Sequence, residues 1–99
     1  MNHTWTVPID HPAFAGHFPG SPILPGVVLL DEALQIMTDA HGIALNNYEI
    51  SQVKFLSPAK PGDELVIQHA AQSSGAIRFD ITSGLRKIAS GSIAPKSTP

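Results

Sequence analysis

The stretch His11–Gly26, with the sequence HPAFAGHFPGSPILPG, limits the possible folds of this chain more than any other segment. Seven of its sixteen residues are proline or glycine, so it forms neither a helix nor a regular strand. Prolines fix φ and restrict the preceding residue, so we expect a stiff loop of one definite shape. Long loops in compact domains usually serve function, which makes His17, near the middle of this loop, a candidate site residue.

The composition fits a single globular domain spanning residues 1–99. A chain of 99 residues with 42% hydrophobic content can bury one core but leaves much apolar surface, so we expect an oligomer. A net charge of −2 with six Lys and Arg residues argues against a nucleic-acid partner. The absence of cysteine fits a cytoplasmic protein, and Asp31 and Glu32 interrupt the apolar run too early for a membrane span.

One helix is expected directly after the loop. A run of helical length extends from Val27 to about His41 and stops at Gly42, a residue favoured just past a helix end. Aliphatic residues dominate the run, so we expect the helix to be mostly buried. Its polar residues fall in one arc of roughly 120° on a helical wheel. They are Asp31, Glu32, Gln35, Thr38 and Asp39.

Alternating apolar residues and turn signals predict the strands. The expected strands are His3–Val7, Tyr48–Ser57, Glu64–Gln72, Ala76–Ser83 and Arg86–Ile93. Short turns between the later strands favour an antiparallel meander. The sequence therefore predicts an α+β fold, in which an antiparallel sheet wraps around one central helix. In an alternating strand, His69 is expected to be a partly buried histidine with a hydrogen-bond partner.

Residues 16–35, GHFPGSPILPGVVLLDEALQ, resemble the active-site segment of the 3-hydroxyacyl-(acyl carrier protein) dehydratases, a family with the hot-dog fold. In that family a histidine in a GHFPG-like motif is followed fourteen positions later by an acidic residue on the central helix. A proline-glycine pair lies between the two. In this chain His17 is followed by Pro25 and Gly26 and then, fourteen positions after the histidine, by Asp31.

A second segment carries the same resemblance. Residues 53–65, VKFLSPAKPGDEL, resemble the family's strand, proline-glycine-aspartate turn and next strand. Typical members have an additional helix and strand before the segment that corresponds to His3–Val7. The resemblance therefore implies a short variant of the family.

The resemblance implies a lyase that removes water from a 3-hydroxyacyl thioester on acyl carrier protein and gives the trans-2-enoyl product without a cofactor. The pathway implied is fatty-acid synthesis or related polyketide or polyene synthesis. His17 would be the base, Asp31 the acid, and the Gly26 N–H a donor to the thioester carbonyl. Further apolar residues are candidates to bind the acyl chain, although packing under the loop explains the two phenylalanines equally well. They are Phe14, Phe18, Pro25 and Val27.

Several alternatives stay open. A solvated helix face also explains Asp31, and Glu32 is a competing candidate for the acid. A hot-dog thioesterase, which would release a free acid, is a second activity on the same fold. The other histidines show no metal-ligand spacing, so we expect no metal site; they are His3, His11, His41 and His69.

The resemblance also implies partners. In the family the histidine of one subunit faces the acidic residue of the other, so we expect a homodimer or a heterodimer with a related, longer subunit. Acyl carrier protein is acidic, and a local positive patch would steer its encounter with the enzyme. Arg86, Lys87 and Lys54 are the candidates for that patch, with plain surface solubility as the alternative explanation.

Overall fold

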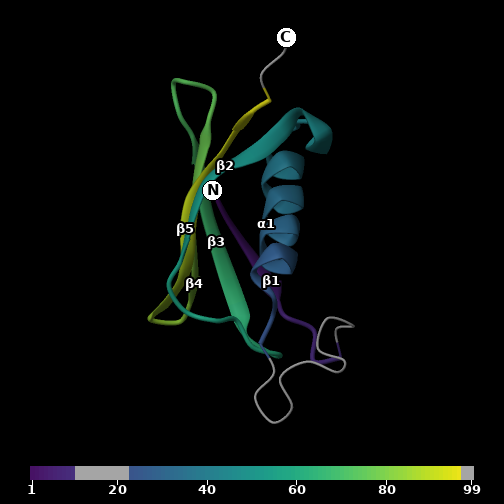
Figure 1. The fold of residues 1–99 in the computed structure, drawn as a ribbon, viewed down its shortest axis with the longest axis vertical. Helices are drawn as coiled ribbons and strands as arrows, with labels where there is room; N and C mark the ends of the chain where they lie inside the picture. Colours follow the sequence, from purple (N-terminus) through teal and green to yellow (C-terminus); the bar gives the residue numbers. More distant parts are fainter. Residues whose placement is uncertain (11–22, 97–99) are drawn as a thin grey trace.

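The computed structural model describes residues 1–10 and 23–96, so most of the expected loop lies outside the described residues. The described chain forms one α-helix, one short 3₁₀ helix and five strands. In chain order they are β1 (Asn2–Thr6), α1 (Gly26–Ala40), η2 (Leu45–Asn47), β2 (Tyr48–Phe55), β3 (Glu64–Ala71), β4 (Ile77–Ser83) and β5 (Arg86–Pro95). The expected α+β class is confirmed, and every expected strand and the helix are present with ends shifted by a few residues (Figure 1).

The five strands form one antiparallel sheet in the order β1-β3-β4-β5-β2. The expected meander is confirmed for β3, β4 and β5, which follow one another in the sheet. It is wrong for β2, which pairs with β5 at the far edge instead of with β3. Residues 56–63, which join β2 to β3, include Pro58 and Pro61 and are longer than a hairpin loop, so they cross the end of the sheet.

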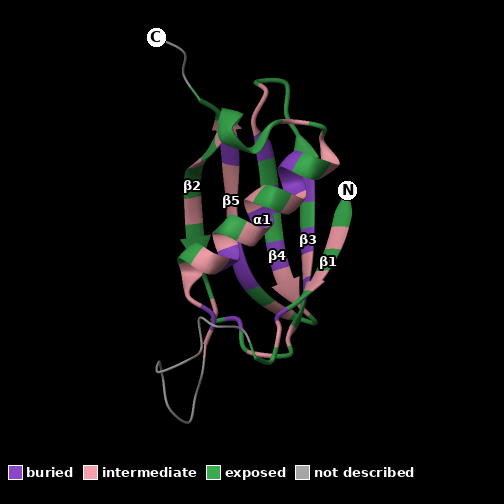
Figure 2. Cartoon of the chain, turned by 90° about the vertical axis from the view of Figure 1, so that its right-hand side faces the viewer, coloured by how far each residue is buried: buried purple, intermediate pink, exposed green. Residues whose placement is uncertain are grey.

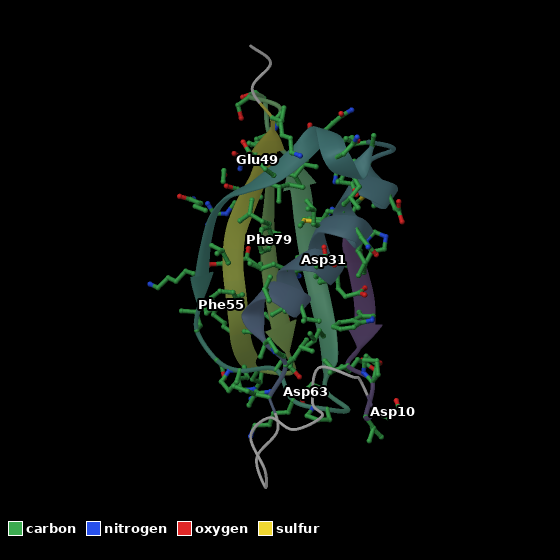
Figure 3. All side chains as sticks on the ribbon, turned by 45° about the vertical axis from the view of Figure 1, so that its right-hand side comes forward. Asp10, Asp31, Glu49, Phe55, Asp63 and Phe79 are labelled. Carbon is green, nitrogen blue, oxygen red and sulfur yellow. The ribbon has the colours of Figure 1, made fainter. Side chains whose placement is uncertain are left out.

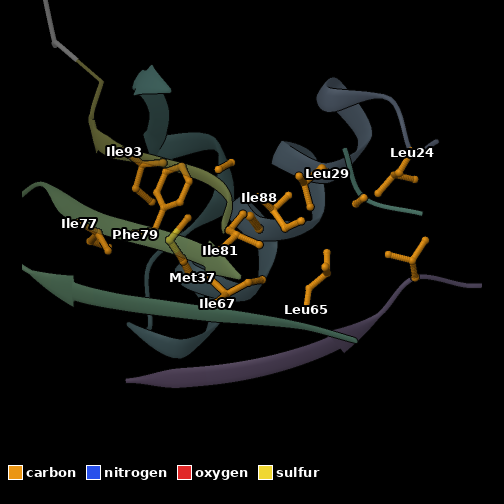
Figure 4. Packing of buried hydrophobic residues seen from close by; sticks show 14 residues of the cluster. Leu24, Leu29, Met37, Leu65, Ile67, Ile77, Phe79, Ile81, Ile88 and Ile93 are labelled. Atoms are coloured by element: carbon orange, nitrogen blue, oxygen red, sulfur yellow. The ribbon is translucent and has the colours of Figure 1, made fainter. Parts of the chain in front are cut away.

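The helix α1 lies across one face of this sheet (Figure 1). Leu29, Ala33 and Met37, spaced four residues apart, are buried against it because positions i and i+4 share one side of a helix. They meet side chains that point from the strands toward α1, among them Leu65, Phe79 and Ile88 (Figure 4). This stripe and the sheet face beneath it form the hydrophobic core.

The expectation of a mostly buried helix is wrong for the single chain. Seen from the side of α1, the outward surface of the helix consists of half-buried and exposed residues (Figure 2). Half-buried Leu30 and Leu34 remain in contact with water, and Val27 is 75% exposed. Thr38, expected in the polar arc, is buried instead, and its hydroxyl is satisfied by donating to the Leu34 carbonyl at 2.8 Å within the helix.

The helix ends as the sequence predicts. His41 is the C-cap and Gly42 follows with φ +67, a left-handed conformation that glycine adopts without a Cβ clash. The Gly42 N–H donates to the Asp39 carbonyl at 3.2 Å and the Ile43 N–H donates to the Thr38 carbonyl at 2.8 Å. These two bonds are those of a Schellman motif, which stops the helix and turns the chain toward β2.

The helix begins under an aromatic ring. A Cβ built on Gly26 would lie 2.7 Å from Cζ of Phe55 and 3.0 Å from Cε1, so the ring fills the space that a side chain would need. A further tie is the Leu24 N–H, which donates to the Ala59 carbonyl at 2.7 Å. The start of α1 is therefore fixed against the end of β2 and the connection that follows β2.

We expect Gly26→Ala to destabilise the fold by about 1–3 kcal/mol, because the added methyl group forces the Phe55 ring out of place. Helix propensity alone would act in the opposite direction, since alanine favours a helix over glycine. Chemical denaturation of Gly26→Ala, Phe55→Leu and the double variant measures the coupling between the two sites. The cost of Gly26→Ala should fall toward zero in the Phe55→Leu background; an unchanged cost there would contradict the contact.

Candidate active site

The residues expected to form the site divide into described and undescribed ones. Pro25, Gly26, Val27 and Asp31 lie at the N-terminal end of α1 or directly before it. His17, Phe14 and Phe18 fall within residues 11–22, outside the described residues. The part of the candidate site that the structure describes is therefore the helix start, Asp31 and the surface around them.

The helix α1 begins with a turn whose first backbone N–H groups have no acceptor within the helix itself. Pro25 caps the helix with φ −57 and ψ 140, and its carbonyl accepts hydrogen bonds from Val28 N–H at 3.0 Å and Leu29 N–H at 3.1 Å. No described residue accepts a hydrogen bond from the N–H of Gly26. The N-terminus of a helix carries a partial positive charge, so this N–H can polarise a carbonyl oxygen or stabilise developing negative charge.

Asp31 lies in a largely apolar hollow of about 540 Å³ on the outward side of α1. It is two residues from both Leu29 and Ala33 and thus about 200° around the helix from the buried stripe. Figure 3 shows Asp31 on α1 in front of the sheet. The hollow is lined by Val27, Val28, Leu30, Asp31, Glu32, Leu34 and Ile50. A carboxyl group surrounded by aliphatic side chains is the arrangement that a proton donor requires, once water is excluded.

Asp31 is not buried within one chain. The residue is exposed, and the aliphatic side chains around it are half-buried or exposed as well. The reason is geometric, because the sheet covers the opposite side of the helix. Glu32, the competing acid, lines the same hollow and is half-buried, so burial does not choose between the two residues.

The sequence assigned no role to Phe55, which the structure brings to the site. Its ring is half exposed and, together with Gly26, Leu24 and Leu56, it lines a second hollow of about 410 Å³. The same ring fills the space on the Cβ side of Gly26. The sequence held a signal for this role of Phe55, because the residue is an aromatic one at the end of an expected strand and directly before a proline-rich connection.

The three basic residues proposed for a carrier patch differ in their surroundings. Arg86 donates to the Asp63 carboxylate at 2.7 Å, and this carboxylate also accepts the Lys60 backbone N–H at 2.9 Å. Arg86 thus ties the start of β5 to the connection before β3. Lys54 on β2 and Lys87 on β5 are exposed, and no ion pair involves them within the described residues.

Two further properties of the described residues bear on the chemistry. No group of three or more histidine, aspartate or glutamate side chains in the described part of the chain could hold a metal ion. No helix among these residues is long and apolar enough to cross a membrane.

Comparison with known proteins identifies the family. The model of the ApeI-like family, described as ApeI dehydratase, matches residues 1–92. A protein named 3-hydroxyacyl-[acyl-carrier-protein] dehydratase FabZ from Chlamydia trachomatis is 42% identical over 71 residues, which cover 63% of this chain and 46% of the relative. The FabZ of Syntrophobacter fumaroxidans is 34% identical over 70 residues, covering 63% and 48%. The matched region thus spans about half the length of these curated relatives.

Solved structures share the fold. A protein from Erwinia carotovora described as uncharacterized superimposes with a TM-score of 0.70 at 27% identity, covering 96% of this chain and 81% of that one. The dehydratase heterocomplex ApeI:P from Xenorhabdus doucetiae gives a TM-score of 0.74 at 24% identity, covering 97% and 86%. The fluoroacetyl-CoA-specific thioesterase FlK gives 0.68 at 16% identity, covering 97% and 87%.

Together these likenesses confirm the expected hot-dog fold. Because a dehydratase and a thioesterase both share it, the fold alone does not decide the reaction. The family match does not depend on the fold, since it rests on sequence and extends over nearly the whole chain. The chain belongs to the ApeI-like dehydratase family.

Proposed function

We propose that this protein dehydrates a 3-hydroxyacyl thioester carried by acyl carrier protein and releases the trans-2-enoyl thioester. The observation that carries the proposal is the position of Asp31, in an apolar hollow one helical turn from the backbone N–H groups at the start of α1. The FabZ relatives, which share up to 42% identity over the matched region, support the same reaction. The thioesterase likeness, at 16% identity, is one of fold only.

The reaction needs three groups, and the chain offers one for each. A base removes the proton from the carbon next to the thioester carbonyl, and the electron pair forms the new double bond. The bond from the neighbouring carbon to the hydroxyl oxygen breaks, and an acid supplies the proton with which that oxygen leaves as water. Histidine changes its protonation near neutral pH, so we assign the base to His17 and the acid to Asp31. The Gly26 N–H would stabilise charge on the thioester oxygen.

We further propose that the site is completed by a second subunit. Asp31 and the aliphatic side chains beside it are open to water, and an acid works best where water is excluded. The hollow extends from α1 to Ile50 on the edge strand β2, so a second chain can cover both at once. In the arrangement that the family resemblance implies, the second subunit places its His17 opposite Asp31 of the first subunit. Each dimer then holds two sites.

The second subunit is either another copy or a related chain. One structural neighbour, ApeI:P, is a dehydratase heterocomplex, and this supports the second possibility. A heterodimer with a longer homologue would leave Asp31 and Gly26 in the same place and change only the source of the facing histidine. Activity of the purified chain alone separates the two assemblies.

We assign acyl-carrier-protein docking to Lys54 and Lys87 and give Arg86 a structural role. Exposed cations are free to steer an acidic carrier, whereas the Arg86 guanidinium is already paired with Asp63. For binding the acyl chain, Val27 and Pro25 are the proposed contacts at the helix start, and Phe14 and Phe18 remain candidates on the loop.

The catalytic assignment predicts the order of three substitutions. His17→Ala should lower the dehydration rate by about 100- to 10,000-fold, because a general base contributes this much. Asp31→Asn should lose most activity, while the matched control Glu32→Gln should lose little. Rates are measured by the enoyl product formed from 3-hydroxyacyl carrier protein in the presence of any required partner subunit. A larger loss in Glu32→Gln would show that the acid is Glu32, and release of free acid would identify a thioesterase.

If the protein is active as a homodimer, inactive variants should complement one another. Mixing His17→Ala with Asp31→Asn subunits produces dimers that retain one complete His17 and Asp31 pair. Random exchange should restore about a quarter of the wild-type rate, since about half the dimers are mixed and each keeps one of two sites. Native mass spectrometry verifies exchange. A mixture that stays inactive after verified exchange would contradict a site shared between subunits.

Charge reversal tests the carrier surface. Lys54→Glu with Lys87→Glu should raise KM for the carrier-bound substrate, more strongly at low salt, because steering by exposed charges is screened by ions. The KM for a small thioester analogue should stay unchanged. Arg86→Glu is the matched comparison, since loss of its ion pair with Asp63 should lower stability and affect both substrates. Equal losses on both substrates in the lysine variant would rule out the docking role.

A further inference from the structure

Three histidines from three elements form a continuous hydrogen-bonded chain away from the Asp31 hollow. His69 on β3 stands in the middle, with its Nε2 2.8 Å from Nδ1 of His3 on β1. Its other ring nitrogen, Nδ1, is 2.9 Å from Nε2 of His41, the C-cap of α1. The rings of His3 and His69 are stacked and those of His41 and His69 meet edge to face. This row of hydrogen-bonded histidines thus joins β1, β3 and the end of α1.

The central ring is buried, and the described charged or titratable groups that shift its pKa are His3, His41 and the amino terminus. His69 is 3% exposed. From β1 it faces His3 and the terminal amino group, which donates to the His69 carbonyl at 2.8 Å, and from α1 it faces His41. On β4 the residue opposite His69 is the apolar Phe79. Burial, and then repulsion from His3, His41 and the amino terminus, lowers the pKa of His69 to about 4.

When all three rings are neutral, both hydrogen bonds form. Each contact between two ring nitrogens needs one hydrogen, and each neutral ring carries one N–H. If the Nε2 of His69 bears its hydrogen, it donates to His3 and accepts from His41 at Nδ1. If the hydrogen is on Nδ1, the direction of both bonds is reversed. Either tautomer leaves the buried ring with both nitrogens satisfied.

The hydrogen-bonded row of three histidines accommodates one additional proton but not two. With one proton added to either outer ring, that ring donates to His69, which donates onward to the third ring. With two protons added, at least one contact brings two N–H groups together, because His69 cannot accept at both nitrogens while it keeps a hydrogen. The second proton therefore breaks a hydrogen bond and places like charges side by side at a buried ring.

We infer that His3, His69 and His41 form an acid-sensitive clasp that holds β1 and the end of α1 to β3 and opens when a second proton binds. Above pH 6.5 the clasp is closed. As the pH falls toward 4 the unfolded or opened chain binds more protons than the closed one, so acid shifts the equilibrium toward the open form. The clasp acts on the same helix that carries Asp31, at its opposite end.

Urea unfolding between pH 7.5 and 4.5 tests the clasp, with His69→Gln as the matched variant. Glutamine keeps a donor and an acceptor but does not titrate. The wild type should take up about one more proton on unfolding near pH 5 than His69→Gln, so its unfolding constant should rise about tenfold more for each unit by which the pH falls. Carboxyl groups contribute equally to both proteins. Equal slopes in the two proteins would overturn the inference.

Two further measurements keep the test decisive if His69→Gln does not fold. His41→Gln shortens the chain to two rings, so its pH slope should fall by about one proton relative to the wild type. In ¹⁵N spectra of the unaltered protein, His69 should keep a single N–H between pH 7 and 5 as long as the fold is intact. Independent protonation of all three rings in an intact fold would contradict the clasp.

Discussion

The packing of one stripe of α1 against the sheet determines most of what this fold can do. Leu29, Ala33 and Met37 are buried on the side of the helix that faces the sheet. Residues about half a turn away, including Asp31, are therefore held outward at a fixed height above the sheet. The same contact that builds the core leaves Asp31 and its aliphatic surroundings open, so the site that we propose there needs a cover from outside the chain to exclude water.

The two ends of the helix are held by different means. At the start, the Phe55 ring packs against Gly26, and at the end His41 is hydrogen-bonded to His69 on β3, while the Schellman bonds close the last turn locally. A helix held at both ends keeps the distance between the Gly26 N–H and the Asp31 carboxyl group constant. Constant spacing is what preorganised stabilisation of a transition state requires, because the groups need not move as charge develops.

Local patterns in the sequence predicted most of the fold. The length of the apolar run, the glycine at position 42 and the alternation in β4 can be read from residues that are adjacent in the sequence. The helix and the strands could therefore be located in advance. The place of β2 could not, because it is decided by a pairing with β5 that lies far along the sequence. The burial of Thr38 and the packing of the Phe55 ring over Gly26 likewise depend on how the helix is placed against the rest of the fold. For His69, partial burial and one hydrogen-bond partner were predicted, whereas the ring is almost completely buried and has two partners.

A site in which Asp31 of one subunit works with the histidine loop of another can be measured directly, because the chain has no cysteine of its own. A chain carrying His17→Cys and Asp31→Cys is treated with a short thiol-to-thiol cross-linker and separated under denaturing conditions, with each single variant as a control. We expect the double variant to yield a covalent dimer of twice the 10.5 kDa chain, with far less from either single variant. A cross-link within a single chain, with no covalent dimer, would contradict the shared site.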